Sequence, residues 1–325
     1  MFHFRFLFLY LMGCFSQAEA TLQTRTQVLM GTFVSISLPS KSSHHSSKVF
    51  LTLKKVEDAL SSFDKNASLA RLNQRHKIKY NKHLGNALIL SQKYYTQTQG
   101  YFDISIGSIS KKLYHFGEEN SKIPSRQSLQ KAILNIDGIE MNATHIYTDA
   151  NITLDLGGMG KGYGVDIALA YLEKAEIKQG IIALSGDIRC LDLCEIYLQS
   201  PFEEKPFAKI RSLVKNLGIS SSGTYRRFVG NQDNHHLINP KTATQGKAFV
   251  SVSLFSTQSN ALLDAYATAI SVMPKDKALA FLKKHTEIAY VLIDVNRKVY
   301  KGNLLKLLKL TIEKAYDKKT NTTDQ

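Results

Sequence analysis

The order of strand-like and helix-like segments is the feature that most constrains the fold of this chain. Apolar residues recur with helical spacing at 46–62, 87–98, 162–174, 259–272 and 276–284. Strand-like runs occupy 28–38, 147–149, 152–156, 180–184, 195–199, 249–255, 288–295 and the residues from 299 onward. Several of these runs follow one another directly, and 147–149 with 152–156 is typical of a strand pair. The sequence therefore predicts an α+β fold with hairpins rather than a doubly wound parallel sheet.

The first 20 residues form a segment that we interpret as an export signal and set apart from the fold. Arg5 precedes a short apolar run, and Ala18-Glu19-Ala20 has the small-x-small form that signal peptidase cleaves. The run is too short to cross a bilayer. We therefore expect a mature N-terminus at Thr21 and a periplasmic protein.

The domain organisation follows from this signal. We expect a signal peptide at 1–20, one domain at 21–317 and a polar tail at 318–325. An alternative cleavage would use Leu11-Met12-Gly13-Cys14 as a lipoprotein box, so that Cys14 carries a lipid anchor in the inner membrane. Both cleavages place the domain outside the cytoplasm.

Export would place Cys190 and Cys194 in an oxidising compartment. Residues 188–196 are typical of two strands around a tight turn, which would bring the two sulfur atoms within disulfide reach. The alternative is a pair of buried thiols. A C-x3-C pair without a second pair or a flanking histidine is weak support for zinc.

The net charge is +15, from 42 Lys and Arg against 27 Asp and Glu. The basic residues are spread along the chain, with the densest groups at 275–284 and 298–309. No recognition-helix or zinc-finger pattern accompanies them. We therefore expect a solvated basic face and no nucleic-acid partner.

A glycine cluster, Asp155-Leu156-Gly157-Gly158-Met159-Gly160-Lys161-Gly162-Tyr163-Gly164, lies between a strand-like run and a helix. Glycines at a helix start let a phosphate approach the backbone N–H groups closely, with Lys161 beside them. The spacing matches neither the Rossmann nor the P-loop fingerprint. Taken alone, the cluster is equally compatible with an anion site and with a tight turn.

Asp264 and Thr268 lie four positions apart in the expected helix at 259–272, so their side chains share one face. Both are oxygen ligands of the kind that suits Mg²⁺, which fills its other positions with water and substrate phosphate. The alternative is a solvent-facing Asp264 and a Thr268 that bonds its own backbone.

His235 and His236 precede Pro240 in a segment that we expect to be extended. Neighbouring side chains in such a segment face opposite sides, so at most one of the two histidines enters a given site. A histidine there could act as a general base near neutral pH.

Together these segments resemble the FAD:protein FMN transferase (ApbE) family. The matching motifs occur in the family's order along nearly all of the mature chain: Met30-Gly31-Thr32, Ser61-x-Phe63 with Ser68 and Asn73, Gly100-x-Phe102-Asp103, Asp155-Leu156-Gly157-Gly158-x-Gly160-Lys161-Gly162, Ser222-Gly223-x-Tyr225, His236-x-Ile238-x-Pro240 and Asp264-Ala265-x-Ala267-Thr268. The resemblance implies a compact, T-fold-like α+β body with FAD in a cleft between two subdomains.

The resemblance also implies an enzyme that uses Mg²⁺ to move FMN from FAD to a threonine hydroxyl of an acceptor protein, forming a phosphoester and releasing AMP. The acceptor would be a flavin-carrying subunit of a membrane redox pump or of an extracytoplasmic reductase. His236 would be the base, and a backbone carbonyl, that of Gly160, would join Asp264 and Thr268 around the metal. The residues implied to line the FAD pocket are Met30, Phe63, Tyr101, Phe102, Asp103, Asp155, Lys161 and Ile238.

The chain departs from the family pattern at four places. Phe63 replaces a tyrosine, Asn239 an aspartate and Ala243 a glycine, and Ser185-Gly186 replaces a double glycine before Asp187. These changes bear on rate and substrate preference more than on fold or FAD binding. Two other functions stay open: a Mg²⁺-dependent FAD pyrophosphatase that gives FMN and AMP, and a carrier that holds FAD without turning it over.

Overall fold

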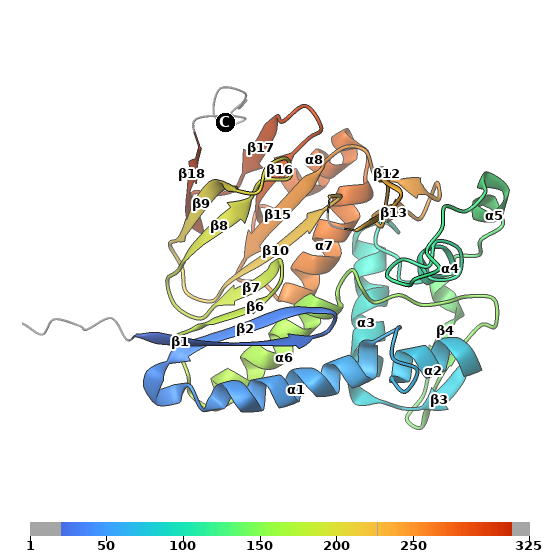
Figure 1. The fold of residues 1–325 in the computed structure, drawn as a ribbon, viewed down its shortest axis with the longest axis horizontal. Coiled ribbons are helices and arrows are strands. Elements are labelled where there is room, and N and C mark those ends of the chain that lie inside the picture. The colour runs from blue at the N-terminus through green and yellow to red at the C-terminus, as the bar shows by residue number, and fades with distance from the viewer. Residues whose placement is uncertain (1–20, 226, 314–325) are drawn as a thin grey trace, which may run out of the picture.

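The computed structural model of the protein describes residues 21–225 and 227–313, and it has mixed α+β architecture (Figure 1). The helices are α1 (His45–Leu60), α2 (Ser68–Arg75), α3 (Lys82–Gln97), α4 (Gly107–Ser110), α5 (Arg126–Gln130), α6 (Gly160–Lys174), α7 (Asn260–Val272) and α8 (Lys275–Lys284), with short 3₁₀ turns at Ser40–Ser42 and Ile136–Gly138. Within the described ranges, no helix combines the length and apolar character that a membrane span requires. The expected signal peptide and the whole of the expected polar tail lie outside the described residues.

The largest element is an antiparallel sheet of eight strands. Its order is β1 (Leu22–Leu29), β2 (Thr32–Pro39), β6 (Ile181–Leu184), β7 (Asp187–Cys190), β10 (Leu217–Gly223), β15 (Ser251–Ser256), β16 (Ala289–Ile293) and β17 (Val299–Gly302). Two three-stranded sheets follow the orders β18 (Leu308–Ile312), β9 (Pro206–Ser212), β8 (Glu195–Gln199) and β3 (Lys77–Lys79), β5 (His145–Thr148), β4 (Ile139–Met141). Two short ribbons pair β11 (Phe228–Val229) with β12 (Asn231–His235) and β13 (Ile238–Asn239) with β14 (Thr244–Gln245).

Both faces of the large sheet are covered at β15 and β16, as side-chain alternation along these strands shows, whereas the edge strand β1 is largely exposed. Leu254 packs in the core that contains α7, whereas the next residue, Phe255, packs in the core that contains the β8–β9–β18 sheet. Leu292 and Ile293 divide between the same two cores. Successive side chains of a strand point to opposite faces, so the helices cover one face and the small sheet covers the other. The prediction of an α+β fold is confirmed.

The run 28–38, expected as one strand, is a hairpin. Strand β1 ends at Leu29, β2 begins at Thr32, and the two residues between them have positive φ angles, 53° at Met30 and 69° at Gly31. Two successive positive φ angles are the signature of the type I′ turn that joins antiparallel strands. The Met30 N–H donates to Glu57 Oε1 at 2.6 Å, which ties the turn to α1.

The expected pairing of 147–149 with 152–156 is also wrong. Strand β5 pairs with β3 and β4. The run 152–156 instead meets the side-chain amide of Asn73, which donates to the Leu154 carbonyl at 2.9 Å and accepts from the Leu154 N–H at 2.8 Å. An amide group offers the same donor and acceptor as a neighbouring strand, so it satisfies the extended backbone without a strand.

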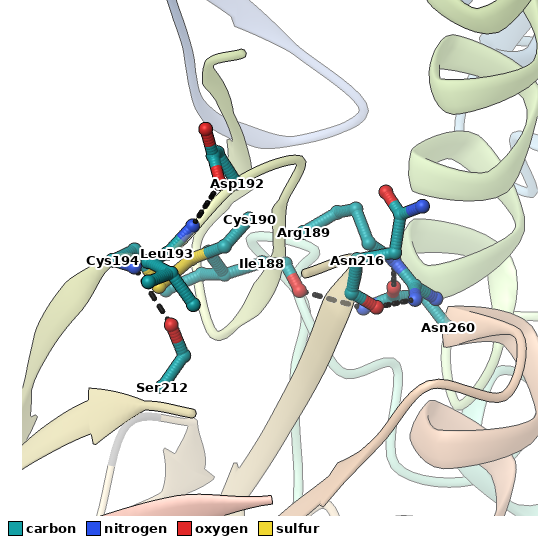
Figure 2. The surroundings of a disulfide bond; sticks show 9 residues. All are labelled: Ile188, Arg189, Cys190, Asp192, Leu193, Cys194, Ser212, Asn216 and Asn260. Carbon is teal, nitrogen blue, oxygen red and sulfur yellow. Dashed lines mark hydrogen bonds between the residues drawn. A yellow bond between two sulfur atoms is a disulfide. The ribbon is translucent and has the colours of Figure 1, made fainter. Parts of the chain in front are cut away.

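Cys190 and Cys194 form a disulfide, with their Cα atoms 6.1 Å apart (Figure 2). The bond is present, but the expected turn between paired strands is not, because β7 pairs with β6 and β10 whereas β8 pairs with β9. The disulfide therefore joins two different sheets. Figure 2 shows the neighbouring Arg189 side chain directed away from the sulfur atoms and toward Asn260, whose Oδ1 accepts from Arg189 Nε at 2.8 Å.

We expect the double variant Cys190→Ala, Cys194→Ala to lose about 2 kcal/mol of unfolding free energy, because the bond closes a short loop in the unfolded chain. Urea unfolding of the oxidised wild type and the variant measures this difference. Dithiothreitol should lower the stability of the wild type and leave the variant unchanged. Equal stability of the two oxidised proteins would contradict the expectation.

Candidate active site

A cavity of about 360 Å³ opens where the β1–β2 turn, the glycine cluster, helix α7 and the segment around His236 meet. This volume is in the range of small-molecule sites. The sequence-predicted residues that line it are Met30, Tyr101, Phe102, Asp103, Asp155, Lys161, His236, Ile238, Asp264 and Thr268. Phe63 and Gly160 are not among the lining residues. With Ser222 and Gly223, which also line the cavity, the fold gathers residues from six separate motifs around it.

Lys161 joins two buried acids at the floor of this cavity. Its Nζ lies 2.7 Å from Asp187 Oδ2 and 3.3 Å from Asp264 Oδ2. Ser220 donates to Asp187 Oδ1 at 2.6 Å, and the Gly162 N–H donates to Asp264 Oδ2 at 3.1 Å. Burial and then the negative charge of Asp187 raise the pKa of Asp264 to about 7, against the opposing effect of Lys161. A cation that shares this carboxylate would favour its ionised form.

Thr268 and the glycine cluster provide neutral oxygen atoms next to Asp264. The Thr268 hydroxyl donates to the Gly158 carbonyl at 3.2 Å. A Cβ atom on Gly158 would lie 3.0 Å from Thr268 Oγ1, so only glycine leaves this approach free. Gly158 lines the cavity, whereas Gly160 begins α6 and its N–H donates to the Leu156 carbonyl. The carbonyl that accepts from Thr268 is therefore that of Gly158.

These oxygen atoms suit a hard divalent cation. Asp264 supplies one buried carboxylate, and Thr268 and Gly158 supply a hydroxyl and a carbonyl. Mg²⁺ binds such oxygen ligands and keeps several water or phosphate ligands. In the described part of the chain, no group of three or more His, Cys, Asp or Glu side chains is placed to hold a metal. The donor set fits an ion completed by a phosphate-bearing substrate better than a closed metal cage.

His236 is held with one ring nitrogen available. Its backbone N–H and its Nδ1 both lie 3.1 Å from the Arg227 carbonyl. A carbonyl only accepts, so Nδ1 carries the proton and Nε2 has a free lone pair. Burial and then the positive charge of Arg227 lower the pKa of His236 to about 4. The ring is therefore neutral at pH 7, the form that a general base requires.

His235 faces away from the cavity, as the alternation predicted. It is buried, with Nε2 3.0 Å from the Gly246 carbonyl and Nδ1 accepting from the Leu237 N–H at 3.2 Å. Both ring nitrogens are used in holding the backbone. His235 is therefore a structural residue.

Asp155 stays ionised although burial opposes its charge. Burial raises the pKa of Asp155, but the positive charge of Lys111 lowers it. Hydrogen bonds from Ser110 at 2.7 Å and from the Gly157 N–H at 2.9 Å lower it further, so that the pKa lies below its ordinary value. The Lys111 Nζ lies 3.4 Å from the centre of the Phe63 ring. Phe63 thus contacts the cation next to Asp155 instead of the cavity.

Two departures from the family pattern concern backbone conformation. Ser185 and Ala243 have φ angles of 58° and 53°, a left-handed region that favours glycine. Both stand where the family has glycine. A serine and an alanine in this region carry a small energetic cost that glycine would not.

A third departure, Asn239, makes a contact that an aspartate could not make when ionised. Its Nδ2 donates to the Val272 carbonyl at the end of α7 at 3.1 Å, and its Oδ1 accepts from the Lys241 N–H at 2.9 Å. We expect Asn239→Asp to lose about 1–3 kcal/mol of unfolding free energy, because a buried carboxylate would face that carbonyl.

Chemical unfolding at pH 7 measures this loss. Asn142→Asp is the matched control, since the exposed Asn142 amide uses its oxygen to accept from the Thr144 and His145 N–H groups. The control should be nearly neutral. An equal loss in both variants would show that the Val272 contact is not the cause.

Sequence reasoning missed several lining residues, among them Ser110, Phe116, Ser221 and Arg227. Ser110 and Phe116 belong to a segment without a motif, and their role depends on how that segment packs. Arg227 could have been found, since it follows the Ser222-Gly223-x-Tyr225 motif by two positions.

Solved ApbE proteins share this fold over nearly their whole length. The flavin transferase ApbE from Vibrio cholerae superposes with a TM-score of 0.73 at 21% identity, over 91% of this chain and 98% of that one. The ApbE protein from Thermotoga maritima gives 0.74 at 18% identity, over 93% and 100%.

The ApbE family model matches residues 30–292, and the chain belongs to the ApbE family. The FAD:protein FMN transferase of Klebsiella pneumoniae is 25% identical over 84% of this chain and 89% of its own length. That of Haemophilus influenzae is 25% identical over 80% of each. The resemblance seen in the sequence is confirmed, and relatives matching most of the chain are enzymes.

Proposed function

We propose that the protein is a Mg²⁺-dependent FAD:protein FMN transferase that attaches FMN to a threonine hydroxyl of an acceptor protein and releases AMP. The observation that carries the proposal is the neutral His236, with a free Nε2, on the same cavity as the Asp264–Lys161 pair. A base and an acid–cation pair on one cavity suit transfer of a phosphoryl-linked group to a hydroxyl.

The reaction balances without a further reagent. The threonine oxygen attacks the FMN phosphorus of FAD and forms the new P–O bond, and His236 Nε2 takes the hydroxyl proton. The bond from that phosphorus to the bridging oxygen breaks, and its electron pair leaves with AMP. The proton on His236 then passes to the leaving phosphate or to water.

The metal would be held by Asp264, Thr268 and the Gly158 carbonyl, the oxygen atoms that meet at the cavity. When bound, Mg²⁺ supplies charge stabilisation for the phosphate oxygens. Asp187 matters here because it also pairs with Lys161, so the lysine keeps a partner when Asp264 binds a cation.

FAD would occupy the cavity between aromatic and polar walls. Tyr101 and Phe102 are buried at 5% and 3% exposure yet line the cavity, so each presents only an edge or face to a ligand. Met30 and Ile238 add apolar contacts, and Asp103 and Asp155 add acceptors. Such a mixture suits a ring system that carries polar groups.

We propose a periplasmic location for the mature enzyme, on the basis of the export signal in the sequence. The acceptor would then be a flavin-carrying subunit of a membrane redox pump or an extracytoplasmic reductase. A lipid anchor on Cys14 is the alternative form of the same exported protein.

Incubation of the protein with FAD and Mg²⁺, with and without an acceptor domain, tests this proposal. A transferase releases AMP only when acceptor is present and yields little free FMN. A pyrophosphatase releases AMP and free FMN without acceptor, and a carrier leaves FAD intact. Either of the last two results would overturn the transfer function.

A further inference from the structure

The cavity lining contains few cationic side chains that could pair with a dianionic ligand. Asp103, Asp155 and Asp264 supply three carboxyl groups, and Lys161 and Arg227 supply the two cationic side chains. The Lys161 ammonium is shared between Asp187 and Asp264. Of these two lining cations, Lys161 is engaged by two acids, whereas Arg227 forms no ion pair with any described residue, so its charge is available to a ligand.

Arg227 also holds the candidate base. Its carbonyl accepts from both the backbone N–H and the ring of His236. Its guanidinium is exposed on the cavity lining and close enough for its charge to lower the pKa values of Asp155, Lys111 and His236. Arg227 therefore places its guanidinium on the cavity and holds His236 through its own backbone carbonyl.

We propose that Arg227 is the phosphate-contacting cation of this site, pairing with the pyrophosphate of FAD beside His236. This inference rests on the proposed function and names a residue that the family motifs did not assign. A guanidinium forms paired, charge-assisted hydrogen bonds with phosphate oxygens, which a lysine cannot reproduce in the same geometry.

The pairing would also prepare the base. Three charged or titratable groups act on His236: Arg227 and His235 lower its pKa, and Asp155 raises it. A pyrophosphate bound to Arg227 would offset the positive charge and raise the proton affinity of Nε2. His236 would thus become a stronger base when the substrate is in place.

Binding of FAD, riboflavin and ADP to the metal-free protein tests the assignment, since none of these measurements needs turnover or an acceptor. We expect Arg227→Gln to bind FAD and ADP about 10–100-fold more weakly, as expected for the loss of a hydrogen bond to a charged group. Riboflavin lacks phosphate, and its affinity should be unchanged. Arg227→Lys should recover part of the loss, and the exposed Arg211→Gln on β9 should bind all three like the wild type.

Nuclear magnetic resonance titration of His236 gives a second readout that a structural role would not move. Saturating ADP should raise the pKa of His236 in the wild type, because the bound phosphates offset the Arg227 charge, and should leave it unchanged in Arg227→Gln. Equal weakening of FAD and riboflavin, or no change in ADP affinity, would overturn the assignment. If the wild-type protein binds ADP through Arg227 but does not bind FAD, the proposed function is contradicted, whereas the assignment of Arg227 as a phosphate-binding residue stands.

Discussion

Replacing Asp264 with alanine is expected to abolish Mg²⁺-stimulated cleavage of FAD while FAD binding stays measurable. Asp264 is the carboxylate beside the Thr268 and Gly158 oxygens, and a hard divalent ion loses most of its affinity when its charged ligand is removed. Lys161 keeps Asp187 as a partner at 2.7 Å, so the variant does not leave that lysine unpaired. AMP release at increasing Mg²⁺ concentration in the presence of an acceptor domain, together with FAD titration, measures both effects.

Asp264→Asn tests whether Mg²⁺-stimulated cleavage depends on the charge or on the shape of the side chain, because asparagine keeps the volume of aspartate and lacks its charge. Asp58→Ala is the matched control, since Asp58 is an exposed carboxylate that pairs with Lys54 on α1. The control should turn over like the wild type. Substantial Mg²⁺-stimulated cleavage by Asp264→Ala would show that the metal binds elsewhere.

Replacing His236 with alanine is expected to lower the rate of flavin transfer by roughly 10²–10⁴-fold, the usual contribution of a positioned base. The ring is neutral at pH 7 and its Nε2 is free, so its loss removes the proton acceptor. FAD affinity, metal affinity and melting temperature should change little, because the ring makes one hydrogen bond to the backbone, from Nδ1 to the Arg227 carbonyl, and lines the cavity. Single-turnover transfer to an acceptor domain isolates this step.

His235→Ala should give the opposite result. His235 holds the Gly246 carbonyl and the Leu237 N–H from a buried position, so its loss should lower the melting temperature. The transfer rate per folded molecule should stay close to that of the wild type. Near-wild-type transfer by His236→Ala would remove the base assignment, and weakened FAD binding with lowered stability would make His236 structural.

Local patterns predicted the helices well. The stretches at 46–62, 162–174, 259–272 and 276–284 agree with α1, α6, α7 and α8 to within a few residues. Helix α3 begins five residues before its expected start because Asn81 caps it by accepting from the Leu84 N–H. Capping and 3.6-residue periodicity are local properties, so a sequence carries them directly.

Pairings between distant segments could not be read in this way. The Met30-Gly31 turn divides a continuous strand-like run, because a type I′ turn depends on two positive φ angles and only one of the two residues is glycine. Asn73 takes the place of a strand partner for Leu154, which lies 81 positions away. Only the folded chain shows which backbone groups such a side chain satisfies.

In the candidate site, too, local patterns could be predicted from the sequence, whereas contacts between distant segments could not. Residues within motifs, such as Asp264 and Thr268, could be assigned because a helix places them on one face. The contact between Thr268 and the Gly158 carbonyl could not, because it depends on where α6 begins within the glycine cluster. The tautomer of His236 depends on the Arg227 carbonyl, nine positions earlier in the chain.

The intact mass of an acceptor domain, after incubation with the protein, FAD and Mg²⁺, tests the central claim most directly. We expect the acceptor to gain the mass of one FMN less one water, with one AMP released for each acceptor modified. An acceptor whose target threonine is replaced by valine should keep its mass, as should the wild-type acceptor without Mg²⁺. An unmodified acceptor in a reaction that consumes FAD, or modification that persists with the valine variant, would contradict threonine-directed FMN transfer.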